Sequence, residues 1–236
     1  MFLPAIYRLE AILNRAERYA ERYHHTAIER VPMDADYQRA IADYASKTGG
    51  FAPNGVCVAT DGFAMAVVPC QIEPEDGIEE GECVVGFHRK VLPVARHSWC
   101  IDDSLLHLRL EPEVVRLDQY TTVQRQTVEG DQALRWRGAL HEVLGADGEG
   151  SKLAPHTGER FRALFAPALV LALGRALGFD HYLGFSYRRA DQQVVVLPDN
   201  RPPGLTPFED FPAPPFGLLM PAIGAQGAIR FYDARL

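Results

Sequence analysis

The sequence Val56-Cys57-Val58-Ala59-Thr60-Asp61-Gly62-Phe63-Ala64-Met65-Ala66-Val67-Val68-Pro69 carries the clearest structural signal in this chain of 236 residues. It consists of an apolar run, a Thr-Asp-Gly turn and a second apolar run that ends at proline. Because an Asp-Gly pair readily adopts the positive φ angles of a tight turn, this pattern predicts a β-hairpin.

Helices and antiparallel strands are predicted to alternate on both sides of this hairpin. Apolar residues at three- and four-residue spacing predict a helix near residues 5–24, and a second short helix follows Asp34. Further helices are predicted near 88–97 and 166–178. The strand candidates are residues 105–110, 114–117, 120–128, 182–187, 193–197 and 216–223. The order predicts an α+β fold in which helices pack on small antiparallel sheets, without a parallel βαβ unit.

Composition predicts a cytoplasmic protein without membrane contact. Hydrophobic residues make up 47% of the chain, which is enough for a buried core. No apolar run approaches the ~20 residues that a transmembrane helix needs, and the N-terminus lacks a signal-peptide pattern. No CxxC pair occurs among the four cysteines (Cys57, Cys70, Cys83 and Cys100), which argues against a zinc ribbon or a redox motif.

A second stretch, Phe216-Gly217-Leu218-Leu219-Met220-Pro221-Ala222-Ile223, belongs with the hairpin. Together the two stretches resemble the signature of the bacterial DNA polymerase III sliding clamp (β subunit). In that family an Ala-Thr-Asp-Gly hairpin and a C-terminal Met-Pro strand meet from neighbouring domains. They form the pocket where polymerases and other partners dock peptide motifs. The resemblance implies a divergent, shortened member with DNA-clamp-like repeats, which binds partners and has no catalytic site or cofactor.

The resemblance also suggests how the chain is divided. Residues 1–144 resemble the middle domain of the family, and 145–158 form a polar, Gly-rich linker. Residues 159–236 resemble part of the last domain, including its Met-Pro strand. A faint echo of the segment that closes the middle domain stands at Ala133-Leu134-Arg135-Trp136-Arg137-Gly138-Ala139-Leu140. The first of the family's three domains has no counterpart.

The peptide groove implied by the resemblance combines residues of the hairpin and the Met-Pro strand. Its expected members are Thr60, Gly62, Phe63, Met65, Leu219, Met220, Pro221 and Ile223. Phe63 and Ala64 stand where the family has a His-Arg pair, so a polar anchor for partners is lost. The other interpretation is that Met65 and Met220 only fill the core and that Thr60-Asp61-Gly62 is only a turn.

Basic residues gather in three segments of a chain whose net charge is −7. These are residues 8–30, 86–97 and 158–175. The resemblance implies that such segments hold double-stranded DNA through its phosphates without sequence preference. The expected contacts are Arg8, Arg15, Arg22, Arg89, Lys90 and Arg96. The other interpretation is that Arg and Glu alternate on solvated helix faces.

Three hypotheses follow. The first is a homo-oligomeric processivity factor, placed on DNA by a clamp loader, that docks a DNA polymerase or other clamp-binding peptides. The second is a ring-less clamp-like adaptor or decoy. The third is an enzyme with a metal site near His24-His25 and Asp34 or Asp36. Because the sequence contains no HExxH, GxSxG, P-loop or Rossmann pattern, we expect neither a metal site nor a catalytic residue.

Overall fold

The computed structural model describes residues 2–4, 6–13, 21–32, 35–47, 52–92, 105–107, 109–110, 114–116, 122–124, 136, 165–178, 183–186, 194–198 and 216–220. Every strand pair in these ranges is antiparallel, as the sequence predicts. The described helices and antiparallel sheets confirm the predicted α+β class. No helix in the described ranges is both long and apolar enough to cross a membrane.

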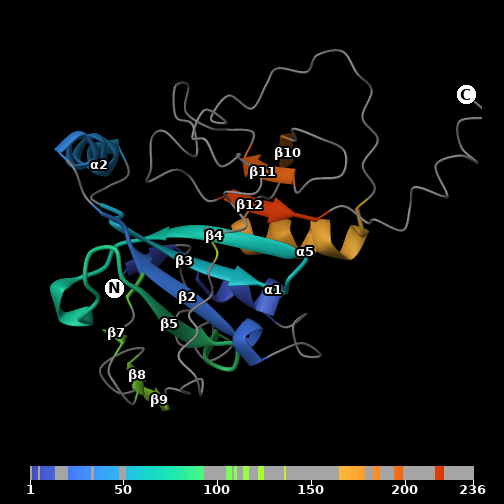
Figure 1. Cartoon of the computed structure of the whole chain (residues 1–236), viewed down its shortest axis with the longest axis horizontal. Coiled ribbons are helices and arrows are strands. Elements are labelled where there is room, and N and C mark those ends of the chain that lie inside the picture. The colour runs from blue at the N-terminus through green and yellow to red at the C-terminus, as the bar shows by residue number, and fades with distance from the viewer. Residues whose placement is uncertain are drawn as a thin grey trace, which may run out of the picture.

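A seven-stranded sheet forms the centre of the molecule, in the order β10-β11-β12-β4-β3-β2-β5 (Figure 1). Its strands are β2 (His25–Arg30), β3 (Gly55–Thr60), β4 (Ala64–Cys70), β5 (Cys83–His88), β10 (Leu183–Ser186), β11 (Val194–Pro198) and β12 (Phe216–Leu219). Two smaller sheets join β1 (Phe2–Pro4) to β6 (Leu105–His107), and β7 (Arg109–Leu110) to β8 (Val114–Arg116) and β9 (Thr122–Gln124). The linker predicted at 145–158 lies outside the described residues, so the division into domains stays a prediction.

Helical segments occur where the sequence indicates them, with two differences in extent. The described helices are the 3₁₀ helices η1 (Ile6–Leu9), η3 (Glu21–His24) and η4 (Pro74–Asp76), and the α-helices α1 (Glu10–Leu13), α2 (Ala35–Lys47) and α5 (Pro167–Leu177). The helix predicted near 5–24 appears as η1, α1 and η3, and residues 14–20 lie outside the description. The helix predicted near 88–97 starts later, because β5 continues through His88 and its pairing extends to the Arg89 N–H, which donates to the His24 carbonyl at 2.8 Å.

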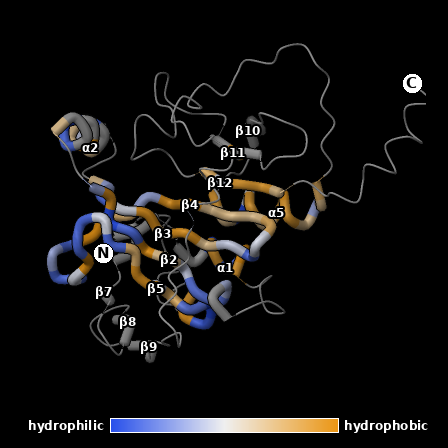
Figure 2. Tube along the Cα trace, viewed as in Figure 1, coloured by the Kyte–Doolittle hydropathy of each residue, from blue (hydrophilic) through white to orange (hydrophobic). Residues whose placement is uncertain are grey.

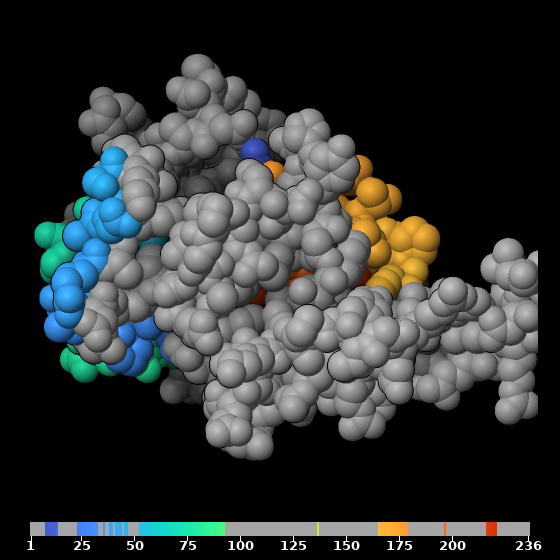
Figure 3. Space-filling view, turned by 90° about the horizontal axis from the view of Figure 1, so that it is seen from above, coloured from blue at the N-terminus to red at the C-terminus, as the bar shows by residue number. Residues whose placement is uncertain are grey.

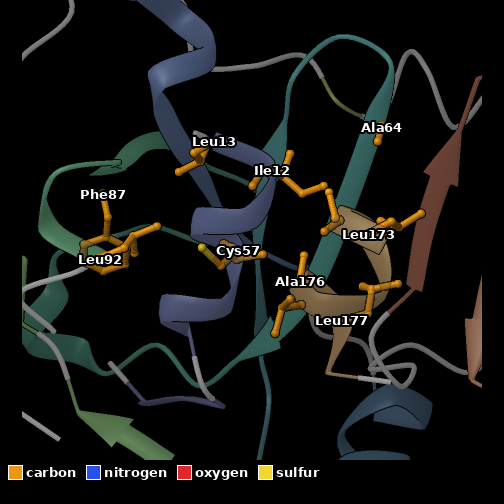
Figure 4. Close-up of a cluster of buried hydrophobic side chains, with 14 of the residues drawn as sticks. Ile12, Leu13, Cys57, Ala64, Phe87, Leu92, Leu173, Ala176 and Leu177 are labelled. Carbon is orange, nitrogen blue, oxygen red and sulfur yellow. The ribbon is translucent and has the colours of Figure 1, made fainter. Parts of the chain in front are cut away.

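One face of the central sheet is covered by α1 and α5, and we call the apolar cluster between them the helix-side core (Figure 4). From α5 come Leu169, Leu173, Ala176 and Leu177, at the spacing of one helical face. Ile12 and Leu13 of α1 and Cys57 of β3 complete it. Burial raises the pKa of the Cys57 thiol to about 12, against a smaller lowering by its hydrogen bond with Thr26, so this thiol is inert.

The other face of the same strands is also buried. It carries Ala27, Val56, Val58, Met65, Val67, Phe216 and Leu218, and Trp136 packs with them. We call this cluster the Trp136 face. Strands that are buried on both sides have no need of polar residues at alternate positions, which explains the unbroken apolar runs of β3 and β4 (Figure 2).

Gly217 allows α5 to lie close to β12. A Cβ atom at this position would stand 2.6 Å from Leu173 Cδ1 and 3.0 Å from the Met65 carbonyl oxygen. Such separations are too short for a Cβ atom, so a larger residue would force the Leu173 side chain or the Met65 backbone to shift. The small residue therefore fixes how the C-terminal strand meets its helix.

Candidate functional site

The hairpin turn is held by side chains of the turn itself. The Thr60 hydroxyl donates to the Ala64 carbonyl at 2.8 Å and accepts from the Gly62 N–H at 3.0 Å. The buried carboxylate of Asp61 accepts from the N–H groups of Phe63 and Ala64 at 2.9 and 2.8 Å. Gly62 has a φ of 89°, the positive value that the Asp-Gly pattern predicts.

β12 lies directly beside this hairpin. It pairs with β4 through Leu218 opposite Met65 and Leu219 opposite Ala64, and the Met220 N–H extends the pairing by donating to the Phe63 carbonyl at 2.8 Å. The expectation that the hairpin and the Met-Pro strand lie side by side thus holds for residues 216–220. Pro221 and Ile223, which the resemblance also assigns to the groove, lie outside the described residues.

The register separates the expected groove residues between the two faces of the sheet. Thr60 is directly opposite Met65, so both side chains belong to the face of Leu218. Leu219 points to the opposite face and is fully buried in the helix-side core. Leu218, and not Leu219, therefore shares the face of Thr60 and Met65. Strand alternation indicates that neighbouring residues lie on opposite faces, but only the pairing partner shows which residue lies on which face.

The accessible part of this site is small. Phe63 is 47% exposed and Gly62 is exposed, whereas Met220 is half-buried. We call these three residues the hairpin tip. Met65 and Thr60 are only 5% and 9% exposed. A ligand on the present surface would meet the tip first and would find Met65 covered.

Tyr23 is a neighbour of the tip that the sequence analysis missed. Two of its ring atoms and its hydroxyl oxygen lie 3.6 to 3.8 Å from the position that a Cβ atom of Gly62 would occupy. Tyr23 belongs to η3, which comes almost forty residues before the turn. No local pattern links the two positions, so only the folded chain shows an aromatic ring beside Gly62.

The residues expected to contact DNA are only partly described. Lys90 is exposed and Arg89 is half-buried, and both follow β5 directly. Arg8 lies elsewhere, with its guanidinium against Gly178 at the C-terminal end of α5. A cation there is favoured by the negative end of the helix dipole. Arg15 and Arg96 lie outside the described residues, and the side chain of Arg22 is not among those described.

Three histidines gather where β2 begins and β5 ends. The rings of His25 and His88 lie 4.7 Å apart, and those of His24 and His88 lie 6.3 Å apart. Burial lowers the pKa of His88 to about 4, with further lowering by the nearby charges of His25, Lys90, His24 and Arg89. Within the described ranges, no group of three His, Cys, Asp or Glu side chains has the arrangement of a metal site.

The described elements form an antiparallel sheet that is covered by helices on one face and in which the β3–β4 hairpin pairs with β12. Known structures identify that fold more closely. The Caulobacter crescentus DNA polymerase III β subunit matches with a TM-score of 0.53 at 14% identity, over 92% of this chain and 63% of that chain. The DnaN sliding clamp from Bartonella birtlesii, bound to griselimycin, matches with a TM-score of 0.52 at 14% identity, over 94% of this chain and 65% of that chain.

The chain therefore has the fold of the bacterial DNA polymerase III β sliding clamps and spans slightly less than two thirds of the length of these two structures. No protein-family model matches the sequence, and no curated protein matches it. The likeness thus lies in the backbone and in the few motif residues described above.

Proposed function

We propose that this protein is a sliding-clamp-like processivity factor of the cytoplasm that docks peptide segments of a DNA polymerase or of other partners. The pairing of β12 with β4 carries the proposal, because it brings Met220 beside Gly62 and Phe63. An extended peptide needs apolar side chains and rigid backbone groups around it, and the hairpin tip offers both. The protein acts by binding, without a catalytic residue or a cofactor.

The tip is the first contact for the peptide in this proposal. Phe63 supplies an exposed aromatic ring, Met220 supplies a flexible and polarizable side chain, and Tyr23 stands beside Gly62. Phe63 and Ala64 stand where the family has a His-Arg pair, so apolar partner residues are favoured over acidic ones. Pro221 and Ile223 remain proposed members of the groove.

A griselimycin titration tests the docking site, because a clamp of the same fold was solved with this ligand. We expect calorimetry to show binding to the wild type and at least tenfold weaker binding for Met220→Ala and Phe63→Ala. The matched control is Leu171→Ala, which removes an exposed apolar side chain of α5, 62% accessible and away from the tip. If all three variants bind griselimycin as tightly as the wild type does, the ligand binds elsewhere.

We further propose that Arg89 and Lys90 contact DNA phosphates inside a homo-oligomeric ring that a clamp loader closes. The negative net charge opposes tight binding to open DNA, so the duplex must be retained by a closed ring around it. We expect retention on circular templates and negligible affinity for short linear duplexes at near-physiological salt. Lys90→Gln is expected to lower the slope of log affinity against log salt by about one unit.

A ring-less adaptor is the second candidate, and two observations favour it. α5 lies at the surface (orange in Figure 3), and its Leu171 is 62% exposed where a DNA-facing helix would carry positive charge. Arg8 lies against Gly178 at the end of the same helix. Size-exclusion chromatography with mass detection separates the two candidates. A monomer at every concentration, with griselimycin binding intact, supports the adaptor.

A further inference from the structure

Basic and titratable side chains gather at the corner of the central sheet where β5 ends. His88 is the last residue of β5 and pairs with His25, the first residue of β2. Their rings lie 4.7 Å apart, and the ring of His24 in η3 lies 6.3 Å from that of His88. Arg89 and Lys90 follow in the turn after β5, and Lys90 is exposed. Within the part of the chain that the structure describes, the titratable groups that act on His88 are these four basic residues.

One hydrogen bond of this turn depends on the protonation state of His88. The backbone N–H of Lys90 donates to His88 Nδ1 at 3.3 Å. Nδ1 accepts this bond only while it carries no proton, so the neutral ring holds its proton on Nε2. Burial keeps the ring neutral by lowering the pKa of His88 to about 4, and the basic neighbours lower it further. The bond between Lys90 and the ring therefore belongs to the neutral form of His88.

Protonation of His88 reverses the role of Nδ1. The protonated nitrogen is a donor, so Nδ1–H and the Lys90 N–H then face each other and both need an acceptor. Neighbouring N–H groups beside cationic side chains are the arrangement that binds an anion. A phosphate oxygen in this place accepts from both donors, and its negative charge favours the charged form of the ring. The same turn thus has a closed neutral form and a protonated form suited to phosphate.

We propose that residues 88–90, which we call the His88 turn, form a proton-linked phosphate site that takes up a proton when it binds a phosphodiester of DNA. The proposal rests on the proposed DNA-binding function, because Arg89 and Lys90 belong to this turn. The linkage is reciprocal: phosphate raises the proton affinity of His88, and the proton raises the affinity for phosphate by the same factor. The protein therefore holds DNA more tightly as the pH falls.

The first test uses dimethyl phosphate, a phosphodiester whose single negative charge does not change over the pH range of the experiment. An NMR titration of the full-length wild type gives the pKa of His88 in dimethyl phosphate and in chloride at the same ionic strength. We expect dimethyl phosphate to raise the measured pKa by about 1 unit or more, because an opposite charge lies beside the ring. The same pKa in both salts would overturn the proposal.

Two matched variants locate the bound phosphodiester. Lys90→Gln removes the exposed cation of the His88 turn, so dimethyl phosphate should raise the pKa of His88 by less than in the wild type. Arg39→Gln removes an exposed cation of α2 and should leave the increase unchanged. If the increase is the same in both variants, dimethyl phosphate does not bind at the His88 turn and the proposal is wrong.

The second test measures retention on circular DNA at pH 7.5 and at pH 5, after loading at pH 7.5. An increase of 1 to 2 units in the pKa of His88 predicts retention about two- to tenfold stronger at pH 5. His88→Gln should lose this gain, whereas His107→Gln, which removes a histidine of the separate β1–β6 sheet, should keep it.

The two tests together separate the phosphate site from the DNA-binding function. Retention that is equal at both pH values contradicts the phosphate site alone, and so does a gain at pH 5 that His88→Gln keeps. An increase in the pKa of His88 with dimethyl phosphate, without retention on circles at either pH, contradicts the DNA-binding function alone.

Discussion

The two faces of the central sheet are buried in different ways. The helix-side core is built by α1 and α5, whose apolar residues recur at helical spacing and come from continuous segments. On the Trp136 face the described strands meet Trp136, which comes from a distant part of the chain and whose indole N–H donates to Glu29, 107 residues away. Both faces are buried, and among the described elements α1 and α5 cover only the first. The difference shows that a face covered by continuous helices can be predicted from local spacing, whereas a contact between distant residues cannot.

Truncation of Leu173 tests the rigid face and should give the largest effect. Leu173 is fully buried against Gly217, so Leu173→Ala removes its packing and leaves a cavity. We expect the free energy of unfolding to fall by about 2–5 kcal/mol in chemical denaturation. The control Leu171→Ala, on the exposed side of the same helix, should change it by less than about 0.5 kcal/mol. Similar losses in both variants would show that α5 is not packed on the sheet as described.

Trp136→Phe tests the opposite face. The change keeps an aromatic ring and removes the N–H that Glu29 accepts, so a buried carboxylate loses one donor. The expected loss is about 1–3 kcal/mol, measured by the same denaturation. Glu29→Leu in the Trp136→Phe background should recover part of it, because the carboxylate is then absent. If Trp136→Phe lowers the free energy of unfolding more than Leu173→Ala does, the helix-side core is not the more strongly stabilising face.

The histidine cluster predicts acid sensitivity where β2 begins and β5 ends. The pKa of His88 is about 4 in the folded protein, below its ordinary value of 6.5. The folded state therefore binds fewer protons than the unfolded state between these values, and stability must fall as the pH drops through this window. The expected loss between pH 7 and pH 5 is about 2 kcal/mol. His88→Gln should flatten this dependence; an unchanged slope would assign the sensitivity to other groups.

Replacement of Arg8 should give the smallest effect. Its guanidinium lies at the C-terminal end of α5, so Arg8→Gln should cost about 0.3–1 kcal/mol and less at high salt. DNA retention on circles should be unaffected by this change and reduced by Lys90→Gln. If Arg8→Gln is retained less well on circular DNA and is as stable as the wild type, Arg8 contacts DNA.

Local patterns predicted the hairpin, α2, α5 and the antiparallel sheets, because each depends on neighbouring residues. The Asp-Gly turn, the first-turn Pro167 and the terminal Gly178, whose φ is 71°, are examples. The helix predicted near 88–97 was placed too early, since β5 continues through His88, whose strand partner His25 lies more than sixty residues away.

Only part of the candidate site could be predicted from local sequence patterns. Motif resemblance proposed Thr60, Gly62, Phe63, Met65, Leu219 and Met220, whereas only the strand register shows that Leu218 shares the face of Met65 and that Leu219 faces the helix-side core. The place of Tyr23 beside Gly62 could not be predicted for the same reason. It comes from a part of the chain that carries no periodic signal toward the hairpin.

The hydrogen bonds of the hairpin turn have a practical consequence. The side chains of Thr60 and Asp61 satisfy backbone groups of the next two to four residues, so the turn is held by its own sequence. The Phe63 backbone engages β12 through its carbonyl, while its side chain is half exposed and contributes to none of these bonds. Position 63 is therefore a suitable site for a library of substitutions. Such substitutions could change which partners bind, while the bonds of Thr60 and Asp61 keep the loop geometry unchanged.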